Sequence, residues 1–146
     1  MATPERLLRA CLGGLIISLL LVGAVSGTPL RHLVQALPAI IVLALARRGL
    51  GWSPFAALSL FLFWLFIMSL IWLFLLGLLN IATGTYSLAE RMLTVAIGLF
   101  CVIGLGAGLR VPRASGPIRR WVAFVAFAAI QAGAMWASLQ PLFARR

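Results

Sequence analysis

Five apolar stretches of about twenty residues each limit what this sequence can fold into. A helix needs about 20 predominantly apolar residues to cross ~30 Å of hydrocarbon. Main-chain groups inside a bilayer have no water to bond, so such a stretch must satisfy them internally, as a helix does. The predicted helices cover approximately residues 7–26, 29–46, 54–80, 88–109 and 118–139.

The composition supports a bilayer as the solvent of this chain. Hydrophobic residues make up 64% of the 146 residues and charged residues only 10%, whereas soluble domains are about half apolar and a quarter charged. A soluble domain of this size lacks the interior to hide so much apolar surface. The predicted fold is therefore an all-α integral membrane protein. It forms a single polytopic domain over residues 1–146, since no loop is long enough to fold alone.

Two of the five stretches leave room for a four-helix alternative. Pro38 interrupts the second stretch, and its fully apolar part is short. The alternative is that this segment lies at the membrane interface instead of crossing the bilayer. The first stretch follows two arginines and reaches Ala24-Val25-Ser26, which has the small residues of a signal-peptide cleavage site. Its apolar run is long for a signal, and we expect residues 1–26 to be retained and five helices to span.

Arginine positions predict the orientation, because cytoplasmic loops of membrane proteins carry an excess of positive charge. All twelve cationic residues are arginine. With five spans and the N-terminus inside, eight arginines lie inside and four outside, with the terminal pair Arg145 and Arg146 discordant. The expected location is a bacterial inner membrane, with a cytoplasmic N-terminus and a periplasmic C-terminus.

Reactive side chains are too scarce for most enzyme chemistry. The chain has no Asp, one His and two Glu, so a Ser-His-Asp triad is impossible and a zinc site lacks clustered ligands. We expect no catalytic residue, no metal and no cofactor. The arginines are spread between apolar runs instead of gathering on one soluble face, so we expect no nucleic-acid partner either.

A few polar residues within or beside the predicted spans are candidates for transport contacts. Three of them have a structural interpretation that we favour: Glu90 completes a capping box with Ser87, Gln131 bonds between helices, and His32 anchors at the interface. The functional alternative is a path for a proton or small solute. The candidates are Glu90, Gln131, His32, Gln35 and Asn80.

Small residues recur at four-residue spacing in the last two predicted helices. Such rows let helix backbones approach closely. We therefore expect these two helices to pack tightly against each other. The predicted packing residues are Gly104, Gly108, Ala129, Gly133 and Ala137.

These features favour a non-catalytic membrane protein, an accessory or scaffold subunit of a larger assembly. Its expected partners are the lipid bilayer and either another protein or further copies of itself. The alternative is a small oligomeric transporter or channel for a small solute or protons.

Overall fold

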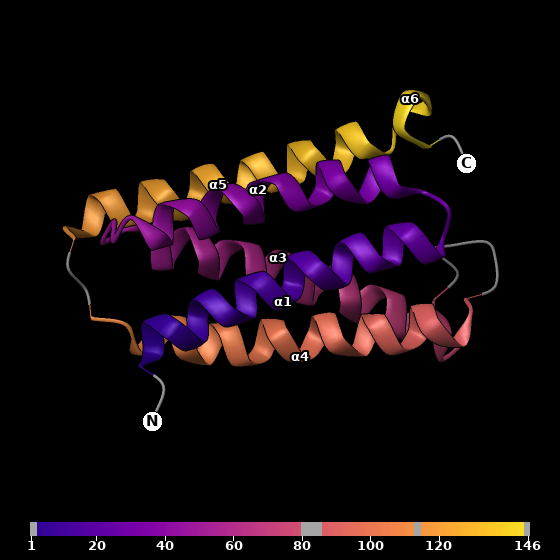
Figure 1. Ribbon diagram of the computed structural model, residues 1–146, viewed down its shortest axis with the longest axis horizontal. Helices are drawn as coiled ribbons and strands as arrows, with labels where there is room; N and C mark the ends of the chain where they lie inside the picture. Colours follow the sequence, from indigo (N-terminus) through magenta and orange to yellow (C-terminus); the bar gives the residue numbers. More distant parts are fainter. Residues whose placement is uncertain (1–2, 80–85, 113–114, 145–146) are drawn as a thin grey trace.

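The computed structural model describes residues 3–79, 86–112 and 115–144. These residues form helices and no strand (Figure 1). The helices are α1 (Pro4–Val25), α2 (Pro29–Arg47), α3 (Ser53–Leu75), α4 (Leu88–Arg110), α5 (Pro117–Ser138) and the short α6 (Pro141–Ala144). Helices α1 to α5 are long and apolar enough to cross a membrane, so the predicted all-α fold with five spans is confirmed.

Proline and hydroxyl residues set several of the helix starts. Thr3 caps α1, where its hydroxyl accepts a 3.4 Å hydrogen bond from the N–H of Arg6. A proline occupies the first turn of α1, α2, α3 and α5, where its missing N–H has no intrahelical partner to lose. Thr28 precedes α2 but makes no cap bond. Its hydroxyl instead contacts Ser26 and His32.

Helix α3 ends at Leu75, five residues before the predicted end at residue 80. Gly77 has a φ of +74°, in the left-handed region that glycine adopts without a steric penalty. The N–H of Leu78 donates to the carbonyl of Leu73 and that of Gly77 to the carbonyl of Phe74, both at 2.9 Å. This Schellman pair closes the helix even though apolar residues continue beyond it.

The five long helices form a closed ring in which neighbours pack in the order α4, α1, α2, α5, α3 and back to α4. Helix α2 also contacts α3 across the ring. Figure 1 shows α2 and α5 along one edge and α4 along the opposite edge. Helix α2 runs beside α1 and α5 as a continuous 19-residue helix despite Pro38. This packing argues against the interfacial alternative for the second segment.

Because the helices alternate in direction, most described arginines gather at one end of the bundle. This end, called here the arginine-rich end, contains the start of α1, the end of α2, the start of α3, the end of α4 and the start of α5 (Figure 1). Its described arginines are Arg6, Arg9, Arg47, Arg48, Arg110, Arg119 and Arg120.

Candidate functional site

The structure brings two of the predicted polar residues together between α2 and α5. Gln131 is completely buried, and its side-chain N–H donates a 3.2 Å hydrogen bond to the main-chain carbonyl of Gln35. The side chain of Gln35 in turn donates to the hydroxyl of Ser138 at 2.9 Å and contacts the sulfur of Met135 at 3.4 Å. Gln35, Gln131, Met135 and Ser138 form the α2–α5 polar cluster, in which side chains of each helix bond to the other helix.

Gln131 of α5 donates to α2 one turn before Pro38. This proline lies inside the helix and has no N–H, which removes one main-chain hydrogen bond and crowds the carbonyl groups of the preceding turn. The carbonyl that loses its intrahelical donor is that of Val34, four residues before Pro38. Gln131 donates to the next carbonyl of the same turn, that of Gln35, from the neighbouring helix. In a medium without water, this bond stabilises the proline-interrupted segment of α2.

One atom of the cluster has no partner. The side-chain oxygen of Gln131 is buried and accepts no hydrogen bond among the described residues. The amide orientation is fixed by the bond to Gln35, since the flipped amide would set oxygen against oxygen. The buried acceptor oxygen therefore has an unmet hydrogen-bonding capacity in the bundle interior.

His32 belongs to a separate group at the turn between α1 and α2. Its Nδ1 lies 3.1 Å from the carbonyl oxygen and 3.2 Å from the hydroxyl oxygen of Thr28, and Ser26 bonds the same hydroxyl at 2.7 Å. The ring packs closely over Gly23, where an added Cβ would come within 2.7 Å of the His32 Cβ. His32 and Gln35 therefore bond in different directions: His32 bonds back to the turn, and Gln35 bonds across to α5.

Glu90 completes the predicted capping box at the start of α4. One carboxylate oxygen accepts from the N–H of Ser87 at 2.7 Å and from its hydroxyl at 2.8 Å. The hydroxyl of Ser87 accepts from the N–H of Glu90 at 3.2 Å. The carboxylate is thus engaged at the helix end. The remaining polar candidate, Asn80, lies outside the described residues.

The predicted packing of the fourth and fifth helices against each other is wrong. Among the described residues α4 and α5 make no contact, because α3 lies between them in the ring. Gly104 and Gly108 are close-approach positions, but their neighbours are Phe61 and Leu58 of α3, with Leu8 of α1 beside Gly108.

The small residues of α5 have a different environment. Ala129 and Gly133 are exposed, and nothing lies within 4 Å of a Cβ built on Gly133. Ala137 is half-exposed. The spacing of small residues in α4 and α5 indicates that a helix can approach closely there, but it does not specify which helix, if any, lies opposite.

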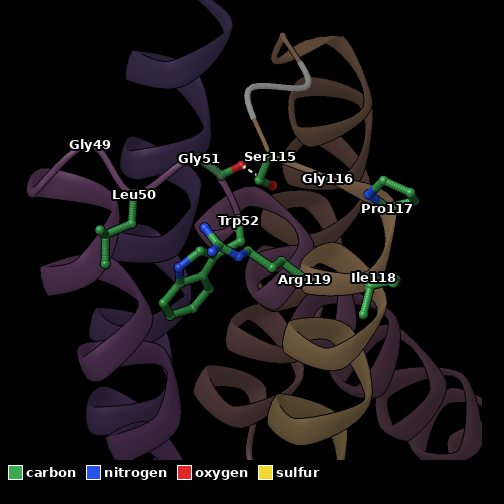
Figure 2. A pocket seen from close by; sticks show the side chains of 9 residues that line it. All are labelled: Gly49, Leu50, Gly51, Trp52, Ser115, Gly116, Pro117, Ile118 and Arg119. Carbon is green, nitrogen blue, oxygen red and sulfur yellow. Dashed lines mark hydrogen bonds between the residues drawn. The ribbon is translucent and has the colours of Figure 1, made fainter.

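A cavity at the arginine-rich end was not predicted from the sequence. It has a volume of about 690 Å³ and lies between the loop joining α2 to α3 and the start of α5 (Figure 2). Helices α3 and α4 separate the two loops in the sequence, and no motif in either loop indicates that they come together. Its lining residues are Gly49, Leu50, Gly51, Trp52, Ser115, Gly116, Pro117, Ile118 and Arg119.

Comparison with known proteins identifies no relative. No protein-family model, curated protein or solved structure matches this chain.

Proposed function

We propose that this small polytopic membrane protein is a non-catalytic accessory or scaffold subunit that docks onto a larger membrane assembly through α5. The observation that supports it is a row on the outside of that helix in which three of four residues are Ala or Gly. Val122, Ala126, Ala129 and Gly133 are all exposed and follow each other at intervals of four, three and four residues, which places them on one face. This row is called the α5 outer face.

The α5 outer face differs from a surface selected only for lipid. The exposed side of α4 has bulky side chains, among them Leu99, Val102 and Leu109, as contact with acyl chains allows. Small residues in a membrane helix allow another helix backbone to approach closely and gain van der Waals contact. Trp136, three residues after Gly133, is exposed at the end of the same row, and Ile130 is exposed beside the row.

The position of α5 in the ring also favours docking. It contacts only α2, α3 and the short α6 among the described helices. Of the apolar part of α5 that could span the membrane, 22% is buried, the smallest fraction among the five long helices. A helix that is attached on one side has the other side available for a partner.

The α2–α5 polar cluster supports a structural role for the interior polar residues. Gln35 and Gln131 are buried and bonded to the opposite helix, which holds α5 against the bundle. The two described cavities lie at the arginine-rich end, away from this cluster.

Charge distribution supports a membrane orientation for this subunit. The arginine-rich end would face the cytoplasm under the positive-inside rule, which places the N-terminus inside and the C-terminus in the periplasm of a bacterial inner membrane. A topology reporter placed after Arg48 should then read cytoplasmic, and a periplasmic reading would contradict this orientation.

Purification from native membranes in a mild detergent tests the docking role. The tagged full chain should retain one partner in fixed stoichiometry, and Gly133→Leu should release it. Gly106→Leu is the matched control, because Gly106 also lies within a helix with nothing within 4 Å of its Cβ, but on α4. Loss of a dimer instead of a foreign protein would identify a second copy as the occupant. No stable partner of either kind, or equal loss with both variants, would contradict the proposal.

A second candidate function rests on the unpartnered oxygen of Gln131. A buried acceptor in the bundle interior is a contact point for a proton-bearing or hydrogen-bond-donating solute, as in a small transporter or channel. This function requires that Gln131→Leu and Glu90→Gln abolish flux into liposomes that contain the purified chain. Absence of flux in the unsubstituted protein would remove it.

A further inference from the structure

We propose that the cavity at the arginine-rich end binds the phosphate-bearing headgroup of an anionic membrane lipid. Its volume of about 690 Å³ lies within the range of about 300–1,000 Å³ that is common for small-molecule sites. The cavity shares no lining residue with the α5 outer face, and the inference does not depend on the proposed docking function.

The fold holds both walls of the cavity in place. Ser115 donates a 3.2 Å hydrogen bond to the carbonyl of Gly51, which ties the two loops together (Figure 2). The Trp52 ring lies against Phe127 of α5, with centroids 6.3 Å apart. The concave shape therefore depends on contacts between residues far apart in the sequence.

The lining of the cavity favours a negative ligand. Arg119 contributes a guanidinium, which recognises phosphate by paired hydrogen bonds, and Figure 2 shows this side chain extending from α5 toward the side occupied by Trp52. The described lining contains no acidic residue. The acid of α1, Glu5, lines a smaller cavity of about 90 Å³ that shares the residues Gly49 to Gly51.

The start of α5 adds to the positive electrostatic potential at the cavity. Its N-cap is Gly116, which has no side chain to cap the first turn, so the N–H groups of Ile118 and Arg119 lack a capping acceptor. The positive end of the helix dipole lies at the same place. The next residue, Arg120, does not line the cavity, and its guanidinium lies over the ring of Phe55, 5.2 Å from the centroid.

An apolar strip leading away from the cavity favours a lipid over a soluble phosphate. Ile118, Trp121 and Val125 are exposed by 78%, 66% and 62%, and their spacing of three and four residues places them on one side of α5. Ile118 lines the cavity itself. A headgroup in the cavity would thus have its acyl chains along a surface that is apolar and at membrane depth. Basic pockets between membrane helices are known to bind acidic headgroups.

Native mass spectrometry of the full chain, released from vesicles of defined composition, tests the site. The vesicles hold phosphatidylglycerol and phosphatidylcholine in equal amounts, and the wild type should retain phosphatidylglycerol preferentially. Arg119→Gln should weaken this retention about five-fold, the effect of one arginine near an anionic bilayer surface. Arg6→Gln is the control, because Arg6 is exposed at the same end, loses the same charge and lines neither cavity.

Each outcome decides the proposal. Preferential retention that falls with Arg119→Gln and stays with Arg6→Gln supports it. Equal losses with both variants would show that the total charge of this end attracts lipid and would overturn the cavity as a site, as would equal retention of both lipids. Inorganic phosphate is tested in the same way. If it displaces phosphatidylglycerol and raises the melting temperature as much as phosphatidylglycerol does, the ligand is a soluble phosphate and the lipid assignment is overturned. In phosphatidylcholine alone, both variants should have the melting temperature of the wild type, which establishes that the fold is intact.

Discussion

Gln131 of α5 donates its side-chain N–H to the main-chain carbonyl of Gln35 in α2, at 3.2 Å and out of reach of solvent. The bond links a side chain in one helix to the backbone of another, one turn before Pro38. It connects the helix with the smallest buried share to the rest of the ring. Together with the bond from Gln35 to Ser138, it holds α2 against α5.

Gln131→Leu should destabilise the bundle by about 0.6–2 kcal/mol, the range of interhelical hydrogen bonds in membranes. The Gln35 carbonyl would lose its donor from α5, while the similar size of leucine limits the loss of packing. Thermal unfolding in detergent measures this difference. Gln140→Leu is the control, since among the described residues the side chain of Gln140 bonds to the carbonyl of Trp136, four residues earlier, and not to another helix. Equal effects of the two substitutions would show that the bond to Gln35 contributes nothing specific.

Ser87→Ala should destabilise the start of α4 by about 0.5–2 kcal/mol, because the first-turn N–H of Glu90 loses its acceptor. Glu90→Gln should be close to neutral, since an amide oxygen can accept the same bonds from Ser87. Hydrogen exchange at residues 87–90 reports on both variants. Strong loss of protection with Glu90→Gln would mean that the negative charge itself is required, which a cap alone does not demand.

Two glycines of α4 should respond to alanine in opposite directions. At Gly104 a Cβ would collide with the ring of Phe61, which is fully buried and cannot swing away, so Gly104→Ala should cost about 1–3 kcal/mol. At Gly106 a Cβ meets nothing within 4 Å, and Gly106→Ala should stabilise the helix by about 0.5–1 kcal/mol. Unfolding of both variants under the same conditions checks the sign of each effect. Two shifts of the same sign would contradict the packing of α3 against α4.

The sequence predicted the number, approximate bounds and helical nature of the spans, because length and hydropathy determine whether a segment crosses a bilayer. It also predicted the capping box, since the residues that form it are neighbours in the chain. The early end of α3 was not predicted, because hydropathy continues past it. Gly77 was the available signal, since glycine is common just after a helix end.

Neighbour relations in the ring were harder to predict. The spacing of Gly104 and Gly108 indicates close approach, but it carries no information on whether α3 or α5 is the neighbour. The partner of Gln131 is a main-chain carbonyl beside Pro38, and its identity depends on the vertical register of two helices almost 100 residues apart. The cavity between the two loops likewise forms only when α2, α3 and α5 are assembled.

Gly133→Leu should leave the folding of the isolated chain unchanged, because the side chain would extend into space that no described residue occupies. The melting temperature of the purified monomer should match that of the wild type. A marked loss of stability would show that α5 uses this face within its own bundle, and the α5 outer face would then be unavailable for docking.

Site-specific photo-crosslinking in native membranes tests the central claim, docking through α5, most directly. A photoreactive amino acid at position 133 on the α5 outer face should give one adduct of discrete mass, either with a partner protein or with a second copy of the chain. The same amino acid at position 106 on α4 should give only lipid adducts. Lipid adducts alone at position 133, or the same protein adduct from both positions, would contradict the claim.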